Sequence, residues 1–202
     1  MGKPVINIAD IELQPRPPAS AANGPAAERY DARMGMIGTL VGARKLGYNL
    51  TAVPPGKRAF PPHSHLVNEE MFFVLEGTGE VQVGEMTYPI RPGDVVALPP
   101  GGRETAHVVT NTGDTELRYL AVSTRIYPEV CEYPVSGKFG VMAELPPGAD
   151  GKPGAFRFVG RVELGVDYVA ISFVRQATDV LRVKQALEQA GVDTPVIAKL
   201  ER

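Results

Sequence analysis

The stretch of sequence that decides the fold runs from residue 56 to residue 77 and reads GKRAFPPHSHLVNEEMFFVLEG. It contains His63 and His65, two of the three histidines in the chain, separated by a single residue. The two prolines before them, Pro61 and Pro62, favour an extended backbone. In an extended segment, residues i and i+2 point to the same face, so both imidazoles can be directed toward one point.

Two more side chains can reach the same point. Glu70 opens an apolar run that is typical of a strand, and the third histidine, His107, lies in another such run. Glu69 is the alternative carboxylate, and the seven-residue step from Glu70 to Gly77 favours Glu70. Three neutral imidazoles and one carboxylate suit Fe(II), Mn(II), Zn(II), Ni(II) or Cu(II). The sequence therefore predicts one divalent transition metal, with open positions for a substrate or O2 if the ion is octahedral.

Short β-type runs separated by turn residues extend on both sides of this stretch. The expected strands are 48–53, 71–75, 80–83, 86–90, 94–98, 105–109 and 117–123. Glycine and proline supply the turns, and together they make up 22 + 19 = 41 of the 202 residues. A strand every 8 to 12 residues or so, with no helical period between strands, is typical of a β-sandwich or barrel.

Two motifs with fixed spacing resemble those of the cupin superfamily. The first is Gly56-x6-His63-x-His65-x4-Glu70-x6-Gly77, and the second is Gly93-x5-Pro99-x-Gly101-x5-His107-x3-Asn111. The first motif has one extra residue before His63, and the second has a loop three residues longer before His107. Neither difference removes a ligand. The resemblance covers about residues 45 to 124.

The resemblance implies a mainly β fold, an antiparallel jelly-roll barrel with the metal inside. It also implies that His63, His65, Glu70 and His107 are the metal ligands. By the same resemblance, subunits pair through edge strands and terminal arms, so we expect a homodimer. No catalytic residue is assigned.

The barrel interior is expected to be mostly apolar, because strand alternation places Phe72 and Val74 on the face of Glu70. The substrate-binding candidates are Arg103, Lys57, Tyr48 and Tyr119. The two cations can clamp an anionic substrate, and the two phenols can donate to an oxygen at the metal. The alternatives are a solvated surface charge for each cation and packing in the barrel for each ring.

The chain ends differ from the barrel. Residues 1–33 are a Pro/Ala-rich arm that is either loose or lies over a neighbouring subunit. Residues 34–154 are the barrel with a Pro/Gly-rich extension, which contains one short β-like piece at 138–142. Residues 155–202 are expected to form a C-terminal β-α-β appendage. Its elements are a strand at 166–174, a helix at 179–190 capped by Thr178, and a strand at 195–200.

Residues 163–202 resemble one β-α-β piece of the pyruvate kinase barrel. In that family, the Lys of a Lys-x-Glu motif stabilises charge at the enolate and the Glu holds a divalent metal. The matching positions are Lys199 and Glu201. A (β/α)8 site is assembled from the loops of several strands, so we interpret this segment as a remnant without the kinase activity.

Composition excludes several function classes. The net charge of −2 gives no support to nucleic-acid binding. No apolar run approaches the roughly 18 residues that span a bilayer, and the N-terminus lacks the apolar core of a signal peptide. The single cysteine, Cys131, excludes an intrachain disulfide and fits a cytoplasmic protein.

The sequence leaves two main functions open, and it does not decide whether the protein is an enzyme. The first is a small-molecule metalloenzyme of the dioxygenase, decarboxylase or isomerase type. The second is a non-enzymatic protein that binds or senses a metal or a small molecule. A pyruvate kinase-related fragment is the remote third possibility.

Overall fold

The structure is a computed structural model of the chain. It describes residues 4–16, 24–145, 154–160, 169–171, 177–189 and 195–198. The helical elements are η1 (Ile8–Asp10), η3 (Gly24–Arg29), α1 (Ile37–Val41), η4 (Arg103–Thr105) and α2 (Ala177–Gln189). The first strands are β1 (Gln14–Pro15), β2 (Arg33–Gly35), β3 (Leu46–Val53), β4 (Ser64–His65), β5 (Glu70–Glu76), β6 (Gly79–Val83), β7 (Met86–Ile90) and β8 (Val95–Leu98). The later strands are β9 (His107–Thr110), β10 (Leu117–Thr124), β11 (Glu129–Tyr133), β12 (Lys138–Leu145), β13 (Gly154–Gly160), β14 (Val169–Ile171) and β15 (Val196–Ala198).

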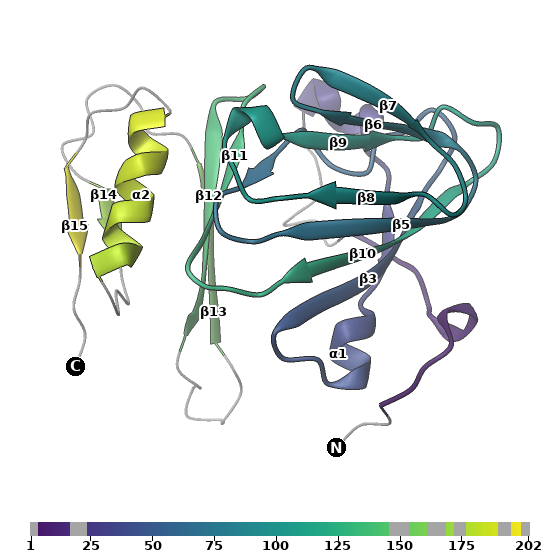
Figure 1. Cartoon of the computed structure of the whole chain (residues 1–202), viewed down its shortest axis with the longest axis horizontal. Helices are drawn as coiled ribbons and strands as arrows, with labels where there is room; N and C mark the ends of the chain where they lie inside the picture. The colour runs from purple at the N-terminus through teal and green to yellow at the C-terminus, as the bar shows by residue number, and fades with distance from the viewer. Residues whose placement is uncertain are drawn as a thin grey trace.

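Two antiparallel sheets face each other across one core, as the jelly-roll prediction requires. One sheet has the strand order β1-β2-β3-β10-β5-β8, and the other has the order β7-β6-β9 (Figure 1). Val74 and Leu117 from the first sheet and Val81 and Val109 from the second belong to the same buried cluster. Burial of apolar side chains from both sheets therefore holds the two layers together. The seven strands expected between residues 48 and 123 are confirmed, with ends shifted by two residues at most.

Two motif residues that are not metal-ligand candidates form turns. Gly77 ends β5 with a φ of +75°, and a Cβ there would lie 2.4 Å from the carbonyl oxygen of Glu116. A side chain at this position would clash with that backbone, so glycine is required. Asn111 is fully buried, and its side-chain amide donates to the carbonyl oxygens of Val53 and Thr115 at 2.7 and 2.8 Å. These residues fix the loops that connect the two sheets.

A further sheet adjoins the barrel, with the strand order β13-β12-β11-β4. The sequence predicted only a short β piece at 138–142 in this region, so the strand β11 was missed. Four consecutive residues of β11, from Glu129 to Glu132, are buried, and two of them are glutamates. A buried strand with this polarity does not show the apolar pattern that identifies strands in a sequence. Its pairing has a direct consequence for the site, because Cys131 lies opposite His65.

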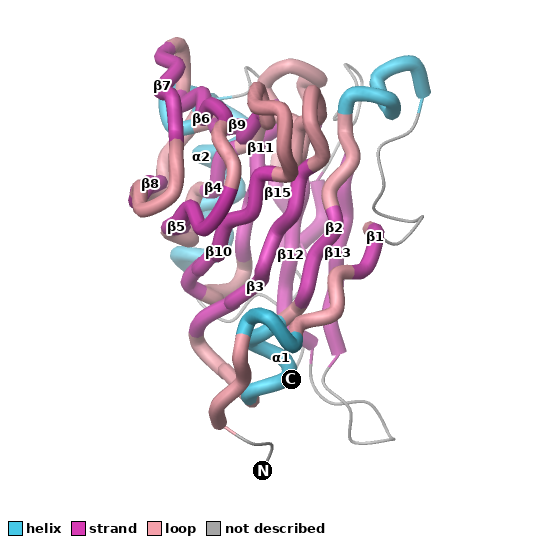
Figure 2. Tube along the Cα trace, turned by 90° about the vertical axis from the view of Figure 1, so that its right-hand side faces the viewer, coloured by secondary structure: helices cyan, strands magenta, loops and turns pink. Residues whose placement is uncertain are grey.

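The described part of the N-terminal arm packs on its own chain. β1 pairs with β2, and β2 pairs with β3, so the arm extends the edge of the barrel sheet (Figure 2). Ile11 is 7% exposed and shares a buried cluster with Ile37 and Leu50. The arm is therefore not loose at these positions.

The C-terminal appendage is a β-α-β unit, as predicted. β14 and β15 pair in parallel, and α2 lies between them in the chain. Val183 and Leu187 of α2 pack against Val130 of β11, which places the helix beside the β11–β12 face (Figure 1). The helix begins at Ala177, so Thr178 lies inside it and not at its cap. Lys199 and Glu201, the pyruvate kinase-like pair, lie outside the described residues.

No helix among the described residues is long and apolar enough to cross a membrane.

Candidate metal centre

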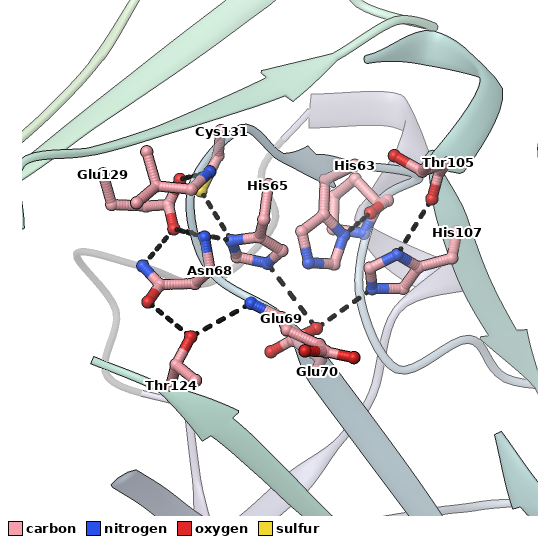
Figure 3. A network of polar contacts seen from close by, with 12 residues as sticks. His63, His65, Asn68, Glu69, Glu70, Thr105, His107, Thr124, Glu129 and Cys131 are labelled. Atoms are coloured by element: carbon pink, nitrogen blue, oxygen red, sulfur yellow. Dashed lines mark hydrogen bonds and ion pairs between the residues drawn. The ribbon is translucent and has the colours of Figure 1, made fainter. Parts of the chain in front are cut away.

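The four side chains expected to bind a metal converge on one point. His63, His65, Glu70 and His107 each offer one ligand atom, and these atoms all lie within 4.8 Å of one another (Figure 3). They come from β4 and the residue before it, from the first residue of β5 and from the first residue of β9. The backbones of His63 and His107 are joined by reciprocal N–H···O bonds of 3.2 and 2.8 Å. The alternative carboxylate, Glu69, is exposed and lies outside this group.

Backbone carbonyls fix the tautomers of two imidazoles. Nδ1 of His63 lies 2.8 Å from the carbonyl oxygen of Pro61, and Nδ1 of His107 lies 3.3 Å from that of Thr105. A carbonyl oxygen can only accept, so each Nδ1 carries the proton and donates it. In the neutral rings, Nε2 then has no proton and is free to bind a metal.

The Nε2 atoms of His107 and His65 both face a carboxylate, which is the arrangement a bound cation requires. Oε2 of Glu70 lies 3.1 Å from Nε2 of His107 and 3.5 Å from Nε2 of His65. Nε2 of His65 is buried and has no hydrogen-bond partner among the described residues. Lone pairs and a carboxylate at these distances repel one another unless a proton or a metal ion lies between them. The residues present therefore fit a divalent transition metal.

The pKa values of the group point the same way. Burial, together with the neighbouring imidazoles of His107 and His65, lowers the pKa of His63 to about 3, so this ring is neutral at pH 7. Burial acts to raise the pKa of Glu70, but the hydrogen bond with His107 and the nearby imidazoles outweigh it and lower the pKa to about 2. Burial lowers the pKa of His65, whereas Cys131 and Glu129 raise it more strongly, to about 11. The centre thus combines a neutral ring, His63, with the negative charge of Glu70, which a bound cation would balance.

His65 is supported by a buried carboxylate from β11. Glu129 is 1% exposed, and its Oε2 lies 3.6 Å from Nδ1 of His65. The backbone N–H groups of Asn68 and Val130 donate to Glu129 at 2.9 and 2.8 Å, and the Asn68 side-chain amide donates to it as well. These donors satisfy the buried carboxylate and hold it in one position. It therefore orients the imidazole, as carboxylate partners of metal-binding histidines do.

Cys131 lies on the same strand and also faces His65. Its Sγ is 3.4 Å from Nδ1 of His65, and the residue is 3% exposed. Its thiol is free and buried, on a strand outside the two barrel sheets. His65, Glu129 and Cys131 form a second group of ligand atoms within 4.8 Å. Because this group shares His65 and the oxygens of Glu129 already accept N–H donors, we interpret it as support for His65.

A cavity of about 290 Å³ extends outward from the centre. His65 and Glu70 lie in its lining, followed by polar residues that include Asn49, Ser123 and Arg125. The expectation of an apolar interior is confirmed for Phe72 and Val74, which lie in the buried core, whereas the cavity beside Glu70 also has polar side chains in its lining. The register explains it: Ser123 of β10 lies opposite Glu70 of β5, and Ala121 opposite Asn49 of β3.

The four substrate-binding candidates from the sequence lie in different places. Tyr48 contributes to the cavity lining, although its ring packs with the cluster of Ile11, Ile37 and Leu50. Tyr119 is 2% exposed in the core, its ring centroid 5.0 Å from that of Phe72, and burial raises the pKa of its hydroxyl.

The two cationic candidates are absent from the lining of this cavity among the residues described. Arg103 is exposed on η4. The ammonium of Lys57 donates to the carbonyl oxygen of Glu28 at 2.7 Å.

Solved structures share the fold of this chain. A sugar phosphate isomerase of the cupin superfamily from Silicibacter pomeroyi DSS-3 matches with a TM-score of 0.60 and 24% identity, covering 76% of this chain and 92% of that chain. A proposed sugar phosphate isomerase from Acidithiobacillus ferrooxidans matches with a TM-score of 0.57 and 26% identity, covering 74% of this chain and 86% of that chain.

Curated relatives match shorter segments. Protein SchB from Streptomyces halstedii is 32% identical over 90 residues, which is 45% of this chain and 62% of SchB. An uncharacterized protein from Methanocaldococcus jannaschii is 31% identical over 71 residues, 35% of this chain and 54% of that protein. The chain thus spans little more than half the length of these relatives. Pyruvate kinase from Mycobacterium intracellulare is 51% identical over 41 residues, 20% of this chain but only 9% of the kinase.

The family model described as the cupin domain matches residues 49–123. This segment runs from within β3 to within β10 and contains all four side chains of the candidate centre. The two-sheet fold, the converging histidines and the family match agree, and residues 49–123 of this chain belong to the cupin family.

Proposed function

We propose that the protein is a mononuclear metalloprotein in which His63, His65, Glu70 and His107 bind one Fe, Mn, Zn, Ni or Cu ion. The observation that supports this most directly is the convergence of four ligand atoms within 4.8 Å at the inner end of a cavity. When bound, such an ion supplies Lewis acidity and a template for a chelating substrate. The function that follows best is catalysis on a small molecule held in the cavity.

Groups of the protein around the ion orient its ligands and line the space beside it. His63 and His107 are held through their Nδ1 atoms by carbonyl oxygens, and His65 by Glu129. Phe72 lies beside the centre, with its ring centroid 5.8 Å from that of His107, and excludes water on the core side. Ser123 lies next to Glu70 and can hydrogen-bond an oxygen of a molecule at the centre.

Three reaction classes remain in the proposal: dioxygenase, decarboxylase and isomerase. The polar lining next to the centre favours an oxygen-rich substrate, and the two solved relatives are both described as sugar phosphate isomerases. The second candidate is a non-enzymatic metal or small-molecule binding protein. It is favoured by one observation: among the described lining residues, the carboxylates and the imidazole all belong to the centre or to its support.

Elemental analysis of the purified protein tests the metal centre. We expect close to one transition-metal ion per chain in the wild type and almost none in the His63→Ala/His65→Ala double variant. Ser64→Ala is the matched control, because Ser64 lies between the two histidines, is fully buried, and lies opposite Glu132 on the neighbouring strand. Circular dichroism shows whether each variant folds. A folded double variant that keeps its metal would refute the proposal.

Kinetics then separate the two candidate functions. An enzyme should lose turnover in His63→Ala and His107→Ala without unfolding. A binding protein should show no turnover in a substrate screen, and its Tm should rise with ligand concentration.

A further inference from the structure

The cavity beside the metal centre has an arginine in its lining. Among the described lining residues, Arg125 is the only arginine or lysine. Its backbone N–H donates to the carbonyl oxygen of Lys45 at 2.8 Å, which continues the β3–β10 ladder beyond Thr124. Strand alternation then places the side chains of Arg125 and Ser123 on the same face. Since Ser123 lies opposite Glu70, the three side chains form one row leading outward from the centre.

A glycine leaves space beside the side chains of Ser123 and Arg125. Gly47 of β3 lies opposite Ser123. A Cβ at Gly47 would lie 2.9 Å from Oγ of Ser123 and 3.8 Å from Cγ of Arg125. Any larger residue at position 47 would therefore crowd the space between the hydroxyl and the guanidinium. The groups can both contact one small molecule only because that space is free.

Polar contacts fix the backbone on both sides of Arg125 (Figure 3). Thr124 accepts a hydrogen bond from the backbone N–H of Glu69 at 3.0 Å and donates to Oδ1 of Asn68 at 2.8 Å. On the other side, the backbone N–H of Ile126 donates to the same Oδ1 at 2.7 Å. The anchor points of Ser123 and Arg125 are thus held before any ligand binds, which reduces the ordering cost of binding.

We propose that this cavity binds a small, oxygen-rich anion. Its carboxylate or phosphate pairs with Arg125, a hydroxyl contacts Ser123, and its other end reaches the metal centre at Glu70. A guanidinium presents a planar set of donors that matches both carboxylate and phosphate. A volume of about 290 Å³ limits the occupant to a small molecule. The inference rests on the proposed function, because it names the substrate class of the same site.

One existing contact competes with the anion. Nη2 of Arg125 lies 3.8 Å from Oε1 of Glu144, and the two side chains are 39% and 55% exposed. An exposed pair at this distance contributes little stability in water. An anion in the cavity can therefore replace Glu144 as the partner of Arg125.

Isothermal titration calorimetry of the full-length, metal-loaded protein at low salt tests the proposal. The probes are glycerol 3-phosphate, glycolate and neutral glycerol, which separate a phosphate from a carboxylate ligand and both from an uncharged one. We expect at least one anion to bind more tightly than glycerol. Arg125→Ala should weaken that binding by about tenfold or more, and Glu144→Gln should strengthen it a few-fold because it removes the competitor.

Arg103→Ala is the control, since Arg103 is an exposed arginine that does not line the cavity, and its anion affinity should equal that of the wild type. Equal affinities for Arg125→Ala and Arg103→Ala, or glycerol binding as tightly as both anions, would overturn the inference. Metal content is measured on the same samples. A metal-loaded protein that binds neither anion contradicts this inference alone, whereas Arg125-dependent anion binding by a protein that holds no metal contradicts the proposed metal centre alone.

Discussion

The three imidazoles of the centre are oriented by two kinds of contact. Two rings contact backbone atoms that are close in the sequence, and the third contacts a side chain that is distant in the sequence. His63 and His107 each donate through Nδ1 to the carbonyl oxygen of the residue two positions earlier, Pro61 and Thr105. His65 instead faces Glu129 of β11, a side chain from a strand that lies beyond the last strand of the barrel sheet. One pair of rings is thus oriented by local backbone, and the third by a distant carboxylate.

This difference determines which of the contacts that orient the imidazoles can be removed by a side-chain substitution. The local supports are backbone atoms, so no side-chain substitution removes them while the segment keeps its conformation. The support of His65 depends on one side chain and on the pairing of β11 with β4. We therefore expect β11 to be the part of the site outside the ligands where substitution affects metal binding most.

The largest effect should come from the carboxylate that the rings share. Glu70→Gln replaces a charged ligand that faces both His65 and His107. Metal affinity should fall by more than the roughly 10–100-fold typical of supporting residues. Glu69→Gln, an exposed neighbour of the same type, should leave it unchanged. Competition titration with a chromophoric chelator measures both, and equal losses in the two variants would show that the carboxylate was assigned incorrectly.

The second prediction tests whether Glu129 supports His65 in binding the metal. Glu129→Gln keeps the shape of the side chain but removes the charge beside His65, so metal affinity should fall by about 10–100-fold. Glu132→Gln is the matched control, because it removes a buried glutamate of the same strand that is not part of either ligand group. If both variants bind metal like the wild type, His65 is oriented as firmly by its local backbone as the other two rings are.

The sequence predicted the ligands but not their supports, for a physical reason. The shared face of His63 and His65 follows from the alternation of an extended chain, which is a local property, and the motif spacing added Glu70 and His107. The contact between His65 and Glu129 depends on which strands pair and in which register, which is not local. β11 could not be recognised because its buried face carries charged residues.

The cavity illustrates the same limit. Arg103 and Lys57 are close in sequence to the motifs, yet the structure places neither in the cavity lining among the residues it describes. Arg125 enters the lining because Ser123, two residues earlier, lies opposite Glu70 across β10 and β5. Sequence proximity to the motifs therefore did not identify the cation that lines the cavity, whereas the strand register accounts for it.

The third prediction concerns stability. Asn68 is 6% exposed, and its side chain joins Glu129, Thr124 and the backbone at Ile126. Asn68→Ala leaves several of these buried groups without partners, which should lower the free energy of unfolding by about 1–3 kcal/mol. Urea denaturation measures it. Thr39→Ala, on the outer part of the cavity lining, is a control that should change stability much less, and an unchanged midpoint for Asn68→Ala would mean that water replaces the lost contacts.

The smallest expected effect is on the pH dependence of the free energy of unfolding, and it distinguishes the two glutamates of β11. Glu129 is surrounded by donors, whereas Oε2 of Glu132 is buried without a hydrogen-bond partner among the described residues. Burial raises the pKa of Glu132, Arg103 opposes this rise, and Glu104 adds to it. The folded state therefore binds this proton more tightly than the unfolded chain. The free energy of unfolding falls as pH rises from the ordinary carboxyl pKa through the raised value.

Glu132→Gln removes that titration. The variant should be more stable than the wild type at neutral pH, and the difference should shrink toward zero as the pH falls below the ordinary carboxyl pKa, where Glu132 is protonated in both states. Urea denaturation of the two proteins at a series of pH values from about 4 to 8 gives this difference, in which the other titrating groups cancel. A variant that is less stable than the wild type at neutral pH would mean that the fold favours the charged form of Glu132.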